Sequence, residues 1–236
     1  MKLQRFYIKD LHNRYGPIAL GHELWLNDKE IAHQLIRVFR ARPGYELILF
    51  NDQEERLYKI IEIGNDLAVK LSLVTDIVRK LPKKEIYLLW SVLKKDKNDW
   101  IMQKATELGV HKFVPIIATR SEKTDINIER AQKIIIEASE QCGRGDIPEL
   151  REPLLLHDAL EQYQYLPLFI CEQNAQNSQT NPPDLDKIGL LIGPEGGWTD
   201  AEKQDFINRR FPHILLSEFT LRAETAAIVA IAKLMN

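Results

Sequence analysis

The stretch "LLIGPEGGWTDAE", Leu190 to Glu202, runs an apolar strand through a glycine-proline turn into the start of a helix. Thr199 and Glu202 have the spacing of a capping box, which predicts that a helix begins directly after the turn. A loop between a buried strand and a helix N-terminus is typical of a ligand site in an α/β sheet. A tight turn could use the same glycines for backbone geometry alone, so both interpretations stay open at this point.

Glu195, in the middle of this loop, limits what the ligand can be. The loop lacks the lysine of a P-loop, and the chain contains no G-x-G-x-x-G pattern. A carboxylate among the loop amides would repel a pyrophosphate by Coulomb interaction. The residues therefore favour a nucleoside-like ligand that is neutral or cationic, such as one that carries a sulfonium.

The rest of the chain divides near Arg79. Residues 1–78 hold short β-rich runs and one helix, opened by Asn27 or Asp28 as its cap, and they predict a small barrel or sandwich. Residues 79–236 alternate buried strands with helices near 99–108, 127–142, 156–163, 200–210 and 223–235. The strands are "EIYLLWSVL", "KFVPIIAT", "LPLFICE", "KIGLLI" and "HILLS". That order predicts a mostly parallel α/β sheet with helices on both faces.

Composition excludes several classes of protein. The chain has 236 residues and 44% hydrophobic side chains, enough for one large domain or two small ones. Its two cysteines give no disulfide framework and no metal-ligand spacing. The N-terminus lacks the apolar core of a signal peptide, and no apolar run approaches a membrane span. We therefore expect a soluble cytoplasmic protein with no metal site and no membrane anchor.

Cys142 ends an apolar stripe in the helix expected at 127–142. The stripe recurs at steps of three and four residues, which indicates one buried face. We expect Cys142 to be a small core residue at the end of this helix, with Gly143 in the C-cap position.

The net charge of −2 conceals an uneven distribution. Residues 79–120 carry 10 basic and 4 acidic side chains, whereas residues 121–236 carry 11 basic and 19 acidic ones. The basic middle is either a solvated lysine-rich face or a surface that follows a phosphate backbone. Charge alone favours the solvated face.

The C-terminal stretch "LRAETAAIVAIAKLMN", Leu221 to Asn236, joins the end of a strand to a helix of small residues. Such a helix permits close approach by another helix or by ligand-bearing loops. Arg222 and Glu224 lie at the loop-helix junction beside buried strands, where charges need partners. This second segment shifts the balance toward a functional site.

Together, "LLIGPEGG" and "LRAETAA" resemble the SPOUT-class methyltransferases, and most closely the family that methylates uridine N3 in 16S ribosomal RNA. "AHQLIRVFRARPG", "IMQKATELGV", "TRSEK" and "EASEQCGRGDIPEL" fit the same family in the same order. The resemblance implies a PUA-like RNA-binding β-barrel over residues 1–78 and a trefoil-knotted, mostly parallel α/β domain over residues 79–236. It also implies S-adenosylmethionine as methyl donor, ribosomal RNA as partner, and a homodimer with cofactor sites at its interface.

The resemblance carries the family's cofactor site onto three segments of this chain. The residues are Phe169, Cys171 and Glu172; Ile192, Gly193, Pro194, Glu195, Gly196 and Gly197; and Leu216, Leu221, Arg222, Ala223, Thr225 and Ala226. We expect Arg222 to stabilise the charge that develops on uridine O2 and O4, with Glu224 orienting it or assisting proton removal.

With this resemblance, RNA contact becomes the favoured interpretation of the basic residues. We expect them to line one RNA groove between the domains. The expected RNA-binding residues are Arg5, Arg37, Arg40, Arg42, Lys94, Lys97, Lys104, Arg120 and Arg144. The chain departs from the family at Leu216–Phe219, where leucine-glycine-proline-arginine is usual and an arginine is missing. Methylation of a ribose 2′-oxygen or a guanine nitrogen, or an RNA-binding module without catalysis, remain alternatives.

Overall fold

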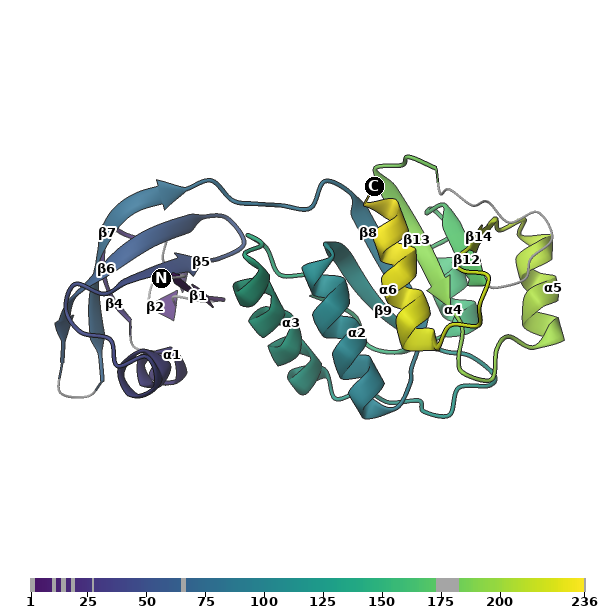
Figure 1. Ribbon diagram of the computed structural model, residues 1–236, viewed down its shortest axis with the longest axis horizontal. Coiled ribbons are helices and arrows are strands. Elements are labelled where there is room, and N and C mark those ends of the chain that lie inside the picture. Colours follow the sequence, from purple (N-terminus) through teal and green to yellow (C-terminus); the bar gives the residue numbers. More distant parts are fainter. Residues whose placement is uncertain are drawn as a thin grey trace. The chain divides into compact units, whose positions relative to one another are not determined.

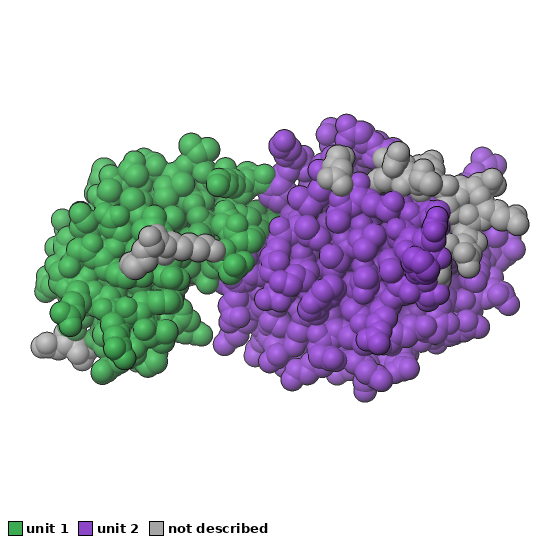
Figure 2. Space-filling view, in the orientation of Figure 1, with its two compact units in different colours: residues 1–81, 139–147 green, residues 82–138, 148–236 purple. Residues whose placement is uncertain are grey.

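The computed structural model describes residues 3–9, 12–13, 16–17, 20–26, 28–64, 67–172 and 183–235. The chain forms two compact units, drawn in different colours in Figure 2. Unit 1 comprises Met1–Leu81 and Ser139–Ile147, and unit 2 comprises Pro82–Ala138 and Pro148–Asn236. The first unit thus includes a short segment from the middle of the chain, which the sequence pattern placed with the second.

Unit 1 is built on a mixed five-stranded sheet in the order β1-β5-β6-β7-β4. Its elements are β1 (Gln4–Tyr7), β2 (His12–Asn13), β3 (Gly16–Pro17), β4 (Glu23–Leu26), α1 (Lys29–His33), η1 (Gln34–Val38), β5 (Glu46–Phe50), β6 (Glu55–Ile63) and β7 (Val69–Ile77). Strand β1 pairs with β5 in parallel, and the other neighbours pair antiparallel. The β-rich character expected for residues 1–78 is therefore present as a sheet with one helical segment.

Local sequence explains how the helical segment begins. The Asp28 carboxylate accepts hydrogen bonds from the Glu30 and Ile31 amides at 2.9 and 3.0 Å, which satisfies two donors at the helix N-terminus. Asp28 is thus the cap, one of the two candidates; Asn27 lies outside the described residues. The helix continues as the π-helix η1 (Gln34–Val38), so α1 and η1 together cover most of the predicted helix.

Unit 2 is a parallel sheet in the order β10-β9-β8-β13-β12-β14, with β11 also paired to β9. Its strands are β8 (Glu85–Ser91), β9 (Val110–Ile117), β10 (Glu149–Leu150), β11 (Leu154–Leu155), β12 (Leu168–Glu172), β13 (Lys187–Ile192) and β14 (His213–Leu215). Its helices are α2 (Lys95–Glu107), α3 (Ile128–Cys142, of which residues 139–142 belong to unit 1), α4 (Leu156–Gln162), α5 (Asp200–Asn208) and α6 (Ala223–Leu234). The predicted parallel α/β architecture is confirmed.

Helices cover both faces of this sheet. Figure 1 shows α2 and α6 side by side, and α6 packs on β13 and β8. On the opposite face, Leu89, Ile170 and Leu191 pack in one core cluster with residues of α4 and α5. No helix among the described residues is long and apolar enough to cross a membrane.

Helix α3 differs from the sequence expectation at its last residue. Ala131, Ile135 and Ala138 are buried as predicted, but Cys142 is exposed. Cys142 is the last residue of the helix, and its Sγ atom lies 3.7 Å from the Ser139 carbonyl oxygen. Gly143 follows with φ of +84° and closes the helix as predicted, its amide donating to the Ser139 carbonyl at 3.1 Å.

Candidate active site

A cavity of about 540 Å³ opens in unit 2 where β12 and β13 end, beside the loop that precedes α5 and the start of α6. Because parallel strands end at the same edge of a sheet, the two strand ends converge there, together with the loop that follows β13 and the start of α6. The residues that line the cavity are Cys171, Glu172, Ile192, Gly193, Pro194, Glu195, Gly197, Trp198, Lys203, Thr220, Leu221, Arg222, Ala223 and Ala226. The two segments singled out from the sequence therefore meet in one site.

The glycine loop, residues 193–197, has a geometry that depends on two of its glycines. A Cβ at Gly193 would lie 3.0 Å from the indole of Trp198, which is buried below it. Gly197 has φ of +66°, a conformation that side chains other than glycine rarely adopt. Trp198 in turn packs edge-to-face on Phe206 of α5, with ring centroids 5.0 Å apart. The loop thus rests on an aromatic base, and its main chain is held close to that base.

Two side chains from distant segments tie this loop to the rest of unit 2. Lys97 of α2 donates a hydrogen bond from Nζ to the Glu195 carboxylate. Arg120 donates from one guanidinium nitrogen to the Gly196 and Trp198 carbonyls at 3.0 and 3.3 Å. The Glu195 carboxylate therefore anchors the loop to α2.

The capping box at the start of α5 is present as predicted. Thr199 accepts from the Glu202 amide, and the Glu202 carboxylate accepts from the Thr199 amide at 2.7 Å. The same carboxylate accepts from the Thr119 amide at 2.9 Å, which links the cap to the end of β9. Burial raises the pKa of the Glu202 carboxyl, but these hydrogen bonds outweigh burial and leave the pKa below its ordinary value.

The two predicted catalytic residues lie at the start of α6. Arg222 is the N-cap residue, lines the cavity and is exposed. Glu224 lies in the first helical turn with only 14% of its side chain exposed, and its Oε2 atom is 3.8 Å from Lys97 Nζ. The hydrogen bond to Glu195, supported by the charge of Glu224, raises the pKa of Lys97 above its ordinary value. Arg222, Glu224, Glu195 and Lys97 thus form a group of alternating charges beside the cavity.

Most, but not all, of the predicted cofactor residues line the cavity. Phe169 is buried within β12, and Gly196 and Thr225 lie in the lining segments without lining the cavity themselves. Leu216 lines a smaller hollow of about 70 Å³, together with Ser217, Phe219 and Leu221. Burial raises the pKa of the Cys171 thiol, so this cysteine is a wall of the cavity and not a thiolate nucleophile.

Three lining residues, Trp198, Lys203 and Thr220, were not predicted. Each is next to or within one helical turn of a residue that the sequence singled out. Trp198 follows the glycine loop directly, and Thr220 precedes Leu221. Lys203 lies in the first turn of α5, the helix that the capping box predicts. The sequence position of the capping box could therefore have placed Lys203 beside the glycine loop.

The predicted RNA-binding residues fall into three groups. Arg37, Arg40 and Arg42 are exposed in unit 1. Lys94 and Lys104 are partly engaged, with Glu122 at 3.7 Å and Glu107 at 2.9 Å. The remaining four, which are Lys97, Arg120, Arg5 and Arg144, make structural contacts.

Arg5 and Arg144 are the clearest departures from the sequence expectation. Their side chains are only 9% and 6% exposed. Arg5 pairs with the buried Glu55 and donates to the Arg144 carbonyl at 3.0 Å, while Arg144 pairs with Asp146 at 2.8 Å. The contact from Arg5 joins residue 144 to β1 within unit 1, and burial leaves neither arginine side chain accessible to RNA.

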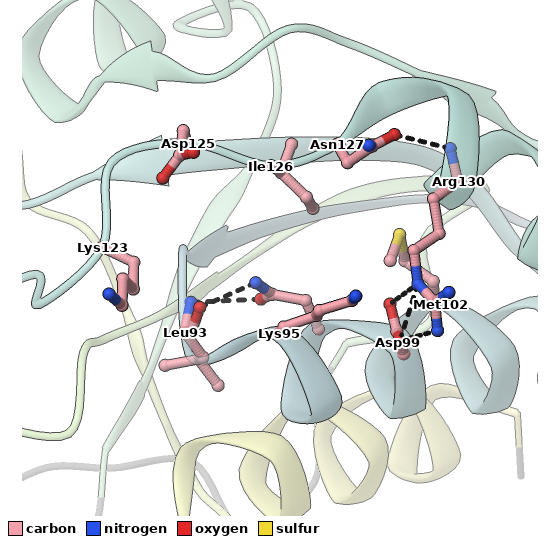
Figure 3. A pocket seen from close by; sticks show the side chains of 10 residues that line it. Leu93, Lys95, Asp99, Met102, Lys123, Asp125, Ile126, Asn127 and Arg130 are labelled. Atoms are coloured by element: carbon pink, nitrogen blue, oxygen red, sulfur yellow. Dashed lines mark hydrogen bonds and ion pairs between the residues drawn. The ribbon is translucent and has the colours of Figure 1, made fainter.

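A second cavity, of about 280 Å³, lies between α2 and the segment that leads into α3 (Figure 3). Figure 3 shows its most prominent pair, in which the Arg130 guanidinium donates to the Asp99 carboxylate at 2.7 and 3.1 Å. This cavity shares no lining residue with the first one. Among the described residues, no group of three or more histidine, cysteine, aspartate or glutamate side chains could hold a metal ion.

Comparison with known proteins identifies the family. Residues 79–235 match the model of the RNA methyltransferase domain. The protein named Ribosomal RNA small subunit methyltransferase E of Rickettsia conorii is 30% identical over 99% of this chain and 95% of its own length. The protein of the same name from Aquifex aeolicus is 31% identical over 96% of this chain and 100% of its own length.

Solved structures agree with this result. The crystal structure of a Ribosomal RNA small subunit methyltransferase E from Neisseria gonorrhoeae, bound to S-adenosyl methionine, superimposes with a TM-score of 0.84 at 26% identity. The match covers 98% of this chain and 96% of that one. The chain belongs to the RNA methyltransferase family that includes the ribosomal RNA small subunit methyltransferase E proteins.

Proposed function

We propose that the protein transfers a methyl group from S-adenosylmethionine to N3 of a uridine in small-subunit (16S) ribosomal RNA. The observation that carries this proposal is the cavity at the ends of β12 and β13, where the glycine loop and the start of α6 converge. Family membership, and a relative of the same family bound to S-adenosyl methionine, support the choice of donor.

The chemistry of the cavity fits this donor. A volume of about 540 Å³ lies within the range of small-molecule sites. Glu172 contributes a carboxylate to the lining, and a carboxylate favours a ligand with a sulfonium and an ammonium group over a pyrophosphate, whereas the Glu195 carboxylate is engaged by Lys97. Small residues such as Gly193, Ala223 and Ala226 leave room for a nucleoside to approach the main chain.

Arg222 and Glu224 are the residues that we place nearest the reaction. The N3 imide of uridine must lose its proton, and N3 then attacks the methyl carbon as the carbon-sulfur bond breaks. The exposed Arg222 guanidinium at the edge of the cavity is suited to stabilise negative charge on O2 and O4 of the base. Glu224, in the first turn of α6, orients Arg222 or receives the N3 proton directly or through water.

We propose further that unit 1 positions the RNA. Arg37, Arg40 and Arg42 are exposed and close together in sequence, at the end of the helical segment of unit 1 and just beyond it. Arginine contacts with phosphates would supply sequence-independent affinity that decreases with salt. The PUA-like character of residues 1–78, the methyltransferase domain over residues 79–236, its trefoil knot and the homodimer are parts of the same proposal, drawn from the family resemblance.

One experiment tests the central proposal. The full-length protein is incubated with methyl-labelled S-adenosylmethionine and with either naked 16S RNA or assembled small subunits, and the RNA is digested to nucleosides for mass spectrometry. We expect 3-methyluridine. A 2′-O-methylated nucleoside or a methylguanine would show a different SPOUT activity, and RNA binding without any transfer would show a module that lacks catalysis. Measurement of mass in solution tests the dimer.

A further inference from the structure

Lys97 occupies a position that its sequence context did not suggest. It lies in a lysine-rich run, "LKKDK", whose other lysines, Lys94 and Lys95, are exposed. The Lys97 side chain is only 23% exposed and points to the opposite side of α2 from Lys95, which lines the cavity in Figure 3. Its Nζ donates a hydrogen bond to Glu195, 98 residues further along the chain. This lysine therefore contacts the candidate active site.

The Glu224 carboxylate also lies near this lysine. Its Oε2 atom is buried and has no hydrogen-bond partner among the described residues. A buried carboxylate oxygen without a donor is costly, because it has lost the water that would solvate it. The ion pair that the structure gives Glu224 is with Lys97 Nζ, at 3.8 Å, beyond hydrogen-bond distance. The same ammonium group thus donates a hydrogen bond to Glu195 and forms a longer ion pair with Glu224.

The geometry points to Lys97 as a positioning residue that joins the glycine loop to the start of α6, through Glu195 on the loop and Glu224 on the helix. This inference rests on the proposed function and adds a residue to the same site. A lysine suits the task because its ammonium is a compact charge with three donors, which can face two carboxylates at once. The planar guanidinium of an arginine would pair with one carboxylate in a fixed geometry.

The consequence of the contact is a preorganised site. Without Lys97, two carboxylates and the exposed Arg222 would remain, and repulsion between the carboxylates would favour separation of the glycine loop from α6. Catalysis depends on alignment of the reacting atoms, so looser loops should lower turnover as well as donor affinity. Lys97 itself need not touch the substrate for this effect.

The test uses the full-length protein with Lys97→Met, and Lys95→Met as the matched control on the first turn of the same helix. We expect Lys97→Met to raise KM for S-adenosylmethionine about tenfold and to lower kcat about tenfold, whereas Lys95→Met changes neither. Lys97→Arg should restore part of the loss. In a double-mutant cycle, Lys97→Met should cost less when Glu195→Gln or Glu224→Gln is already present.

A second measurement is independent of methyl transfer. Amide hydrogen exchange over residues 193–199 in the cofactor-free protein should be faster in Lys97→Met than in Lys95→Met, at an unchanged melting temperature. Equal exchange in the two variants, together with equal KM and kcat, would overturn the role of Lys97. If the wild-type protein bound no S-adenosylmethionine, the proposed function would fail, and the exchange rates alone would decide whether Lys97 holds the loop.

Discussion

The two units of this protein use charged side chains in opposite ways. In unit 1, Arg5, Glu55 and Arg144 form a buried cluster whose side chains are 3–9% exposed. In unit 2, Lys97, Glu195 and Glu224 form a group beside the candidate active site whose side chains are 14–26% exposed. Arg5, Arg144 and Lys97 all looked from the sequence like residues for RNA contact.

Burial separates the roles of the two sets. A buried ion pair is costly to break, because the remaining partner keeps its charge without solvation. A partly exposed group keeps more contact with water, so the loss of one member affects stability less and the geometry of the site more. We therefore expect the buried cluster to control folding and the partly exposed group to control activity.

The largest effect should come from the buried cluster. Glu55→Ala leaves Arg5 buried without its anionic partner, and we expect the free energy of unfolding to fall by about 3–5 kcal/mol. Urea denaturation measures the change. Glu62→Ala, at an exposed position of the same strand, is the control and should change it by less than about 0.5 kcal/mol. A stability loss in Glu55→Ala no larger than in Glu62→Ala would break the comparison.

Arg222→Ala should act on catalysis and leave stability unchanged. Loss of a group that stabilises transition-state charge typically lowers kcat by about 10²–10³. Calorimetry should give an affinity for S-adenosylmethionine within about threefold of the wild type, because Arg222 interacts mainly with the developing charge. Arg210→Ala, at an exposed arginine beyond α5, is the control. Unchanged turnover in Arg222→Ala would remove this residue from the chemistry.

The exposed arginines of unit 1 extend the comparison to RNA binding, since they are predicted RNA-binding residues that the structure leaves exposed. The double change Arg40→Glu and Arg42→Glu should weaken RNA binding and reduce the slope of log affinity against log salt by about 2. Binding assays at several salt concentrations measure both. Lys133→Glu, on α3, is the charge control. A salt slope equal to that of the control would place the RNA elsewhere.

The smallest effect concerns Glu202, whose pKa is lowered in the folded protein by hydrogen bonds from Thr119 and Thr199 that outweigh burial. A lowered folded-state pKa contributes stability above the unfolded pKa, and this contribution is lost as the pH falls through the folded value. We expect Glu202→Gln to reduce stability by about 1 kcal/mol at pH 7 and to flatten its decline in acid. Melting temperatures from pH 7 to pH 3 measure this, with Asp200→Asn as control.

Much of the candidate site was visible in the sequence because its signals are local. The glycine loop, the capping box at Thr199 and Glu202, and the start of α6 are each encoded by a few consecutive residues. The periodicity of residues 79–236 predicted alternating strands and helices, and a parallel sheet brings the ends of β12 and β13 to one edge. The order of the strands in the sheet depends on contacts between distant segments, so the sequence pattern did not predict it.

Individual partners were the part that local patterns could not supply. Basic residues look alike in a sequence, whether they are solvated, bind phosphate or pair with a buried carboxylate. Cys142 likewise continued an apolar stripe, yet it is exposed at the last residue of its helix. The contact between Trp198 and Gly193 also depends on the path of the loop.

The sequence by itself determined the class of fold, the glycine loop and the family resemblance, since these depend on residue order and short-range periodicity. Only the tertiary structure decided that Lys97 contacts Glu195, that Arg5 is buried against Glu55, and that residues 139–147 belong with unit 1. The physical reason is that an ion pair depends on distance and burial, and both are set when segments 50 to 98 residues apart pack together.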